Sequence, residues 1–333
     1  MYIPPFTIST NAINLIAEIS AQIERYAIRL EQSDGLRLRK ANRVRTIHSS
    51  LAIEGNMLSE NEVKDIIDGK TVMAPLRQIQ EVKNAIKTYE LYEKLNPFDV
   101  NDLLKAHGTM MMALTDDAGK FRRGGVGVFS EERLVHMAPP ADRVPFLLDD
   151  LFEWLKQAKD HLLIRSCVFH YEFEFIHPFS DGNGRMGRLW QSLILGRLHP
   201  LFEYLPLDNM VYANQEAYYN AIQHSTATAD SGPFIEFMLQ EILNTLKRHQ
   251  GSLISQHNVM EVRDKIRDKF GISSEQIIEQ IQRNPAVTLD EIAAALSVTR
   301  RSIEKKIKEL RDAGYIRREG SNKSGRWIVN DEV

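Results

Sequence analysis

Residues 176–190 read IHPFSDGNGRMGRLW, a short polar stretch between two strongly apolar segments. Phenylalanine, tyrosine and isoleucine crowd positions 169–176 before it, and leucine, isoleucine and tryptophan crowd positions 189–195 after it. The helical spacing of the apolar residues predicts two helices joined by a polar loop. Polar loops held by a buried scaffold commonly carry binding or catalytic residues. We therefore expect the functional site here.

The composition is that of an ordinary soluble globular protein. The chain has 333 residues, enough for two or three domains, with 43% apolar and 26% charged residues. Its one cysteine, Cys167, excludes an intrachain disulfide and, among apolar neighbours, is expected to be a core residue rather than a nucleophile. The N-terminus shows no signal peptide, and no stretch reaches the roughly 18 apolar residues that a membrane helix needs. We expect a cytoplasmic protein.

Most of residues 1–250 are predicted to be helical. Apolar spacing and capping signals place helices near 13–30, 44–56, 59–69, 77–96, 99–114, 144–158, 162–176 and 185–198. Gly55 is expected to end the second of these helices, and Ser59 with Glu62 forms a capping box for the third. One hairpin is predicted in 119–140, with its return strand from Leu134 to Met137. The expected fold is mainly α with one β-hairpin.

The pattern changes at about residue 273. Three short helices, over 274–284, 288–298 and 299–316, precede a small hairpin around Ser324 and Gly325, which resembles a winged-helix module. Its basic third helix favours DNA binding, but a protein-interaction or dimerisation module fits as well. Ten cations face only four acids in the third helix and the wing: Arg300, Arg301, Lys305, Lys306, Lys308, Arg311, Arg317, Arg318, Lys323 and Arg326.

Two kinds of ligand suit the central loop. His170, Glu174 and His177 share a helix face at i, i+4 and i+7, a spacing that could bind a transition metal. That interpretation leaves the polar residues after His177 without a role. A phosphate site uses all of them, since the loop runs into the start of a helix, where backbone N–H groups lack internal partners.

The phosphate hypothesis gives each loop residue a task. Gly182 and Gly184 let the backbone approach a phosphate closely, and Asn183 tolerates the same conformations and adds a side-chain donor. Arg185 and Arg188, three apart on one helix face, could fork onto phosphate oxygens. Asp181 supplies a hard oxygen ligand for Mg²⁺, and His177 is placed to take a proton from an attacking hydroxyl.

The segment from His177 to Arg188 resembles the Fic family motif HPFx(D/E)GNGRxxR at every defining position. The resemblance extends over roughly residues 75–250 and implies the family's all-helical fold with a hairpin. It implies transfer of AMP from ATP, with Mg²⁺, to a Ser, Thr or Tyr hydroxyl of a target protein. The implied roles are the base for His177, the Mg²⁺ ligand for Asp181, the anion hole for Gly182, Asn183 and Gly184, and phosphate contacts for Arg185 and Arg188. Phe179 is expected to pack inward and anchor the loop.

The hairpin resembles the family's target-binding flap. Main-chain groups of an exposed strand edge can pair with an extended segment of a partner. The alternative is a structural hairpin without a partner. The residues assigned to the flap are Gly125, Val126, Gly127 and Val128.

A second short motif, SSLAIEG, resembles the family's inhibitory helix, (S/T)xxxE(G/N). It assigns Ser50, Glu54 and Gly55, and implies that Glu54 pairs with Arg188 and thereby displaces the γ-phosphate. The alternative is an ordinary helix with a solvated Glu54. In some family members this glutamate also supports AMP removal, so a de-AMPylating enzyme stays open.

The resemblance also suggests a partition of the chain: 1–74 with the inhibitory helix, 75–250 as catalytic core, 251–272 as linker helix and 273–333 as winged helix. Tyr218 and Tyr219 lie where the family places part of its adenine pocket, although aromatic pairs at this spacing also occur in cores. The competing functional class is a DNA-binding regulator whose core only senses nucleotide. The expected partners are a target protein, DNA and a second copy of the chain, but no membrane.

Overall fold

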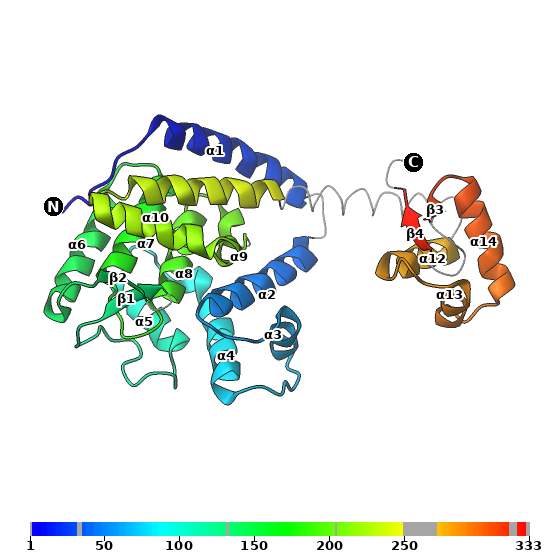
Figure 1. The fold of residues 1–333 in the computed structure, drawn as a ribbon, viewed down its shortest axis with the longest axis horizontal. Helices are drawn as coiled ribbons and strands as arrows, with labels where there is room; N and C mark the ends of the chain where they lie inside the picture. The colour runs from blue at the N-terminus through cyan, green and yellow to red at the C-terminus, as the bar shows by residue number, and fades with distance from the viewer. Residues whose placement is uncertain are drawn as a thin grey trace. The chain divides into compact units, whose positions relative to one another are not determined.

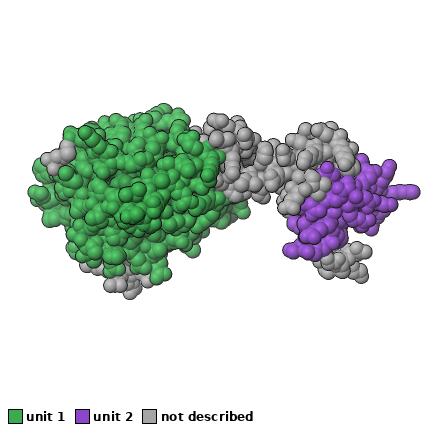
Figure 2. Space-filling model, turned by 90° about the horizontal axis from the view of Figure 1, so that it is seen from above, with its two compact units in different colours: residues 1–248 green, residues 249–333 purple. Residues whose placement is uncertain are grey.

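The computed structural model describes residues 2–31, 35–130, 133–203, 205–248, 272–319 and 325–330. They form two compact units, 1–248 and 249–333 (Figure 2). The expected linker helix at 251–272 lies outside the described residues, apart from Ile272, with which helix α12 begins. Among the described helices, none combines the length and apolar character needed to cross a bilayer.

In the residues that the structure describes, the regular structure of the first unit is helical apart from one hairpin (Figure 1). A further helix covers residues 232–248. The labelled elements are α1 (Thr10–Glu31), α2 (Gly35–Ile53), α3 (Glu60–Ile67), α4 (Leu76–Glu90), η1 (Tyr92–Lys94), α5 (Val100–Met110), β1 (Gly127–Ser130), β2 (Arg133–Met137), η2 (Ala141–Arg143), α6 (Val144–Gln157), α7 (Leu162–Ile176), α8 (Asn183–Gly196), η3 (Pro200–Glu203), α9 (Leu207–Ala213) and α10 (Gln215–Thr228).

Helices α7 and α8 form the centre of this unit and pack against each other. Helix α7 is apolar on nearly all sides, as expected of a helix enclosed by others. Phe169, Phe173 and Trp190 are fully buried, and each contributes about 2 kcal/mol through the apolar surface it removes from water. The indole Nε1 of Trp190 donates to the carbonyl of Pro97 at 3.0 Å. The loop between α7 and α8 is thus held by two rigid, buried elements.

The N-terminal helices pack onto this centre. Helix α1 lies along the helix of residues 232–248 (Figure 1), joined to it by a 2.7 Å ion pair between Glu18 and Lys247. Helix α2 packs against α9, where the Ser49 hydroxyl donates to Asn209 at 3.1 Å. Helix α2 ends at Ile53, and Gly55 takes the left-handed conformation with φ of 87°, as expected of a helix stop. These contacts fix the end of α2 beside the loop.

The predicted hairpin is confirmed. Strands β1 and β2 pair antiparallel, with Gly127 opposite Met137 and a register shift between Val128 and Phe129. The two ends of the hairpin, just before β1 and just after β2, are both hydrogen-bonded to one buried arginine, Arg122, which also bonds to the loop.

Arg122 uses its whole guanidinium on backbone carbonyls. Its Nε donates to the carbonyl of His177 at 2.8 Å, and Nη1 donates to that of Gly124 at 2.7 Å. Its Nη2 donates to the carbonyls of Pro139 at 2.5 Å and Ile176 at 3.3 Å. The Arg122 side chain is 3% exposed, so water cannot readily take the place of a lost carbonyl acceptor. The Arg122 side chain therefore holds the two ends of the hairpin and the start of the loop in place together.

The second unit has the three helices and the hairpin predicted for a winged helix. Its elements are α12 (Ile272–Arg283), α13 (Leu289–Ala295), α14 (Arg300–Asp312), β3 (Ile316–Glu319) and β4 (Arg326–Val329). Thr288 caps α13 in a capping box with Glu291. The unit has its own core, which includes Ile281, Ile303 and Trp327.

We predict that Arg122→Lys lowers the free energy of unfolding of the first unit by about 2 kcal/mol, because an ammonium cannot reach four carbonyls with the geometry of a guanidinium. Urea unfolding of the full chain, followed by near-ultraviolet circular dichroism, measures the change. The matched control is Arg123→Lys at the neighbouring exposed position, which should change stability by less than about 0.5 kcal/mol. Equal losses in both variants would contradict the role given to Arg122.

Candidate nucleotide site

The loop between α7 and α8 adopts two left-handed conformations. His177 follows the last residue of α7 with φ of 49°, and Gly182 precedes the first residue of α8 with φ of 87°. A Cβ on Gly182 would lie 2.8 Å from the sulfur of Met111, so a larger residue would have to displace that side chain as well as adopt a left-handed conformation. The chain thus enters α8 with its first N–H groups free of helical partners, as a phosphate site needs.

Asn183 closes the loop from inside. Its Oδ1 accepts from the backbone N–H of Phe179 at 2.9 Å, and its Nδ2 donates to the carbonyl of the same residue at 2.8 Å. The expectation that this side chain donates to phosphate was therefore wrong, because its amide is already used to hold the turn. The inward packing predicted for Phe179 is confirmed, since the ring is fully buried.

His107 from α5 packs against the buried side of the loop. Its ring stacks on Phe179 at 3.6 Å between centroids, with an interplanar angle of 5°. Nδ1 accepts from the N–H of Gly119 at 2.9 Å, so Nε2 carries the proton and donates to the carbonyl of Asp181 at 3.0 Å. Burial lowers the pKa of His107, which keeps the ring neutral at pH 7. Nothing in the sequence around His107 connects it with a loop so far along the chain.

Asp181 and Arg185 lie at the mouth of the loop. Arg185 is buried, and its Nη2 contacts Oδ1 of Asp181 at 2.9 Å. Arg77 from α4 approaches Oδ2 of the same carboxylate at 3.4 Å. The carboxylate is partly exposed, so it can exchange these arginine contacts for a hard cation, and its chemistry fits Mg²⁺ shared with phosphate oxygens. No pattern in the sequence predicted that Arg77 reaches this site.

Arg188 is buried and makes hydrogen bonds through Nε and Nη2. Its Nη2 donates to Oε1 of Glu54 and to the carbonyl of Ser50, both at 2.9 Å. Its Nε contacts Oδ1 of Asp208 at 2.9 Å. Burial opposes the charge, but the carboxylates of Glu54 and Asp208 raise the pKa of Arg188, so it stays charged. The structure thus joins Glu54 to Arg188, and it adds Asp208 from α9, which no sequence pattern indicated.

Glu54 also contacts the first turn of α8. A Cβ on Gly184 would lie 2.6 Å from Oε1 of Glu54 and 2.8 Å from Nη1 of Arg188. The carboxylate therefore lies against the backbone of the expected anion hole. A phosphate bound to both this turn and Arg188 would need the same space.

His177 is held at its backbone and faces a carboxylate. Its N–H donates to the carbonyl of Phe173 at 2.9 Å, and its own carbonyl accepts from Arg122. Its Nδ1 lies 3.8 Å from Oε2 of Glu174, one turn earlier on α7. Burial raises the pKa of Glu174 to about 7. The imidazole itself is partly exposed, so a reacting group can reach it.

The transition-metal interpretation of His170, Glu174 and His177 is wrong. Within the described ranges, no three histidine, cysteine or acidic side chains are placed to hold a metal ion. His170 is buried in the core, with Nδ1 2.6 Å from Oε1 of Gln191 and Nε2 3.0 Å from the hydroxyl of Tyr218. Both ring nitrogens are thereby used, and burial lowers the pKa of His170 to about 4.

The two tyrosines differ in exposure. Tyr218 is 2% exposed and hydrogen-bonded to His170, so its ring belongs to the core and cannot stack on adenine. Tyr219 packs edge-on against it and is only partly buried. The buried, apolar setting expected for Cys167 is confirmed, and burial raises the pKa of its thiol to about 12.

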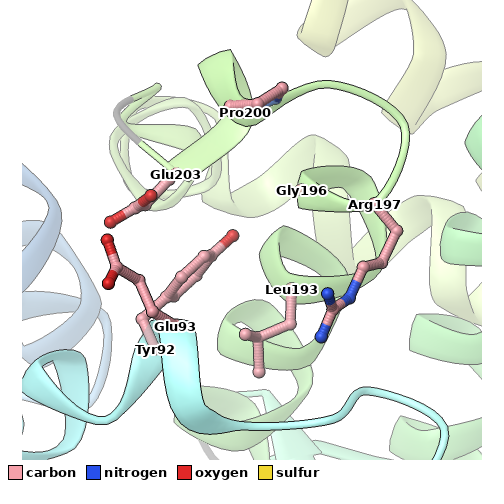
Figure 3. Close-up of a pocket in the computed structure, with 7 residues that line it drawn as sticks. All are labelled: Tyr92, Glu93, Leu193, Gly196, Arg197, Pro200 and Glu203. Carbon is pink, nitrogen blue, oxygen red and sulfur yellow. The ribbon is translucent and has the colours of Figure 1, made fainter.

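A separate pocket of about 200 Å³ lies at the opposite end of α8, beside Gly196. Figure 3 shows the carboxylates of Glu93 and Glu203 on one side of it and the guanidinium of Arg197 on the other. The hydroxyl of Tyr92 donates to the carbonyl of Ser192 at 2.6 Å on its wall. The length of α8 separates this pocket from the His177 loop, so it is not part of the candidate site.

Two family descriptions match the chain: Fic/DOC family over residues 97–195 and HTH domain over residues 273–323. Protein adenylyltransferase fic-1 of Caenorhabditis briggsae is 27% identical over 220 residues, which are 62% of this chain and 41% of that protein. The chain spans less than half the length of this curated relative and of its Caenorhabditis elegans counterpart.

Solved structures extend the comparison to nearly the whole chain. Fic-1 from C. elegans shares the fold with a TM-score of 0.58 and 19% identity, over 74% of this chain and 73% of that one. A Fic family protein from Desulfovibrio desulfuricans G20 is 40% identical, with a TM-score of 0.73, and the alignment covers 99% of this chain and 98% of that protein. With the motif at 177–188 folded into an open helix N-terminus, these matches show that the chain belongs to the Fic family.

Proposed function

We propose that the protein transfers AMP from ATP to a hydroxyl of a target protein and that Glu54 restrains this activity. The observation that carries the proposal is the loop itself, where an accessible His177 stands beside an open helix N-terminus and two arginines. Helix N-termini and arginine forks bind phosphates, and a histidine serves as a base near neutral pH. The curated relatives that match the chain carry the name protein adenylyltransferase, which supports the same activity.

In the proposed reaction, the target hydroxyl loses its proton to the exposed edge of His177 as its oxygen attacks the α-phosphorus of ATP. The bond from that phosphorus to the bridging oxygen breaks, and pyrophosphate leaves. The N–H groups of Gly182, Asn183 and Gly184 and the side chain of Arg185 would hold the developing charge. Asp181 would hold Mg²⁺, which neutralises phosphate charge when bound.

The restraint is a competition for Arg188. Glu54 occupies the guanidinium that would otherwise hold the γ-phosphate, and its carboxylate lies against Gly184. ATP would then bind in a pose unsuited to in-line attack. The flap would present the target segment through main-chain hydrogen bonds, with Gly125 and Val126 just before strand β1 and Gly127 and Val128 at its start.

We predict that Glu54→Gly raises AMP transfer at least about tenfold. Losing a charged hydrogen bond of about 1.5–3 kcal/mol frees Arg188 for phosphate, which corresponds to roughly 10–100-fold. The measurement is label transfer from ATP with Mg²⁺, using α-labelled and γ-labelled nucleotide in parallel. Label from the α position alone supports AMP transfer.

His177→Ala in the Glu54→Gly background is the control for chemistry and should abolish the label. Glu60→Gly, an exposed acid at the start of α3, is the matched control for charge and should behave like the unchanged protein. Equal transfer of label by Glu54→Gly and the unchanged protein would contradict the proposed restraint by Glu54. Intact ATP binding without label from either position in the presence of a cell extract would favour a nucleotide sensor over an enzyme.

A second activity, DNA binding, is favoured by the exposed face of α14. Ile303, Ile307 and Leu310 form its buried face. Arg301, Lys305 and Lys308 are exposed on the opposite face, and the described part of the chain shows no acid paired with them. Three cations on the outer face of the third helix of a helix-turn-helix unit can contact DNA phosphates or bases.

We predict that replacing Arg301, Lys305 and Lys308 together by alanine weakens duplex binding and flattens its salt dependence. The slope of log affinity against log salt should fall by about 0.9 for each DNA phosphate that the protein no longer neutralises. Fluorescence anisotropy with a labelled random duplex between low and moderate salt measures both effects. Lys83→Ala with Lys87→Ala, at exposed positions of α4, should change neither. Duplex binding that is absent even at low salt would favour a protein-interaction module.

A further inference from the structure

The buried carboxylate of Glu174 lies next to Nδ1 of His177. Glu174 is 8% exposed, and its Oε2 is 3.8 Å from the buried Nδ1 of the imidazole. Its Oε1 has no hydrogen-bond partner in the described residues and no contact with solvent. A buried carboxylate oxygen without a hydrogen bond is costly, so a position like this one calls for a functional reason.

The backbone of α8 leaves room for this carboxylate. A Cβ on Gly187 would lie 2.9 Å from Oε1 of Glu174 and 3.3 Å from the ring of His170. Position 187 is one of the two variable positions between the motif arginines, so the phosphate-binding residues themselves do not demand a glycine there. The space that it leaves lets Oε1 lie against helix α8 while Oε2 faces Nδ1 of His177.

The charges around Glu174 come from several elements. On its own helix, Nε2 of His170 lies 3.9 Å from Oε1, and His177 faces Oε2. From α8, Arg188 favours the carboxylate anion, while Glu54 at the end of α2 opposes it. From α10, Tyr218 and Tyr219 lie within electrostatic range. Burial remains the largest influence and raises the pKa of Glu174, while the charge of Arg188 opposes that rise.

We propose that Glu174 is the positioning residue of the base: it orients the His177 ring with Nδ1–H toward Oε2 and stabilises the imidazolium that forms. This proposal rests on the proposed function. The proton of the target hydroxyl passes to Nε2, the Nδ1 proton stays on the ring, and Oε2 balances the new charge without taking the proton. A shift of about 1 Å by either side chain brings the two atoms to hydrogen-bond distance. A base oriented by a third group is a recurrent arrangement in nucleophilic catalysis.

The first test needs neither target nor nucleotide. The ring of His177 is titrated by NMR in the full chain, with its signal identified by its loss in His177→Ala. Glu174→Gln should lower the titration midpoint of that ring by about one pH unit, a tenfold loss of proton affinity, because an anion 3.8 Å away stabilises the protonated ring. An unchanged midpoint in Glu174→Gln overturns the proposal.

The matched control is Glu172→Gln on the same helix. Glu172 is also buried, and burial raises its pKa to about 7, but it hydrogen-bonds to the hydroxyl of Tyr2 at 3.2 Å instead of facing the loop. It should leave the His177 midpoint in place. An equal shift in both variants would indicate a general effect of removing a buried charge and would overturn the specific pairing. Gly187→Ala, which keeps every charge but displaces the carboxylate, should move the midpoint in the same direction as Glu174→Gln.

The second test follows label transfer from α-labelled ATP in the Glu54→Gly background. Glu174→Gln should lower the maximal rate about 10–100-fold, by analogy with the loss of partners that orient metal-bound histidines, with ATP affinity unchanged. A loss confined to ATP affinity would overturn the positioning role. If Glu54→Gly itself transfers no label, the proposed function fails while the NMR titration still decides whether Glu174 and His177 are coupled.

Discussion

The buried guanidinium of Arg188 is the constraint on which the arrangement of the first unit depends. A charge that is 4% exposed must be matched, and here two carboxylates from different helices match it. Glu54 brings the end of α2, and Asp208 brings the start of α9. Because α2 also packs against α9, the ion pairs and the apolar contact support each other. The guanidinium of Arg188 thus holds the N-terminal helices in place, and it is also the group to which the γ-phosphate is proposed to bind.

Backbone groups, rather than side-chain partners, fix the rest of the site. Arg122 binds four carbonyls, His107 binds one carbonyl and one N–H, and Asn183 binds both backbone groups of Phe179. All three side chains are buried. Their hydrogen bonds leave the loop little freedom, so its amides are oriented before any ligand arrives. Such preorganisation is the main physical source of electrostatic stabilisation in enzyme sites.

The sequence was sufficient to predict the helical fold, the hairpin, the C-terminal helices and the contact between Glu54 and Arg188. The first three follow from apolar periodicity, capping signals and turn signals, whereas the contact between Glu54 and Arg188 was implied by the resemblance to the Fic family. It did not reveal Arg77, His107 or Asp208, because each reaches the site from a helix that is remote in the chain and carries no local pattern. It also misassigned the side chain of Asn183, since an amide serves as well inside a turn as at a phosphate. Composition near the loop could not distinguish these uses without the backbone conformation.

The position of Gly55 bears on how fast the proposed restraint by Glu54 could open. Glu54 lies beyond the last residue of α2, and the left-handed glycine follows it at once. The backbone N–H groups of Glu54, Gly55 and Asn56 bond to carbonyls of the last turn of α2, so the carboxylate can leave Arg188 by side-chain rotation or by opening of that one turn, while the rest of the helix stays intact. Local turns rearrange within nanoseconds to microseconds, much faster than a packed helix unfolds. Exchange between the closed and open states would then be rapid compared with catalytic turnover, and the fraction of open molecules would follow the nucleotide concentration without a lag.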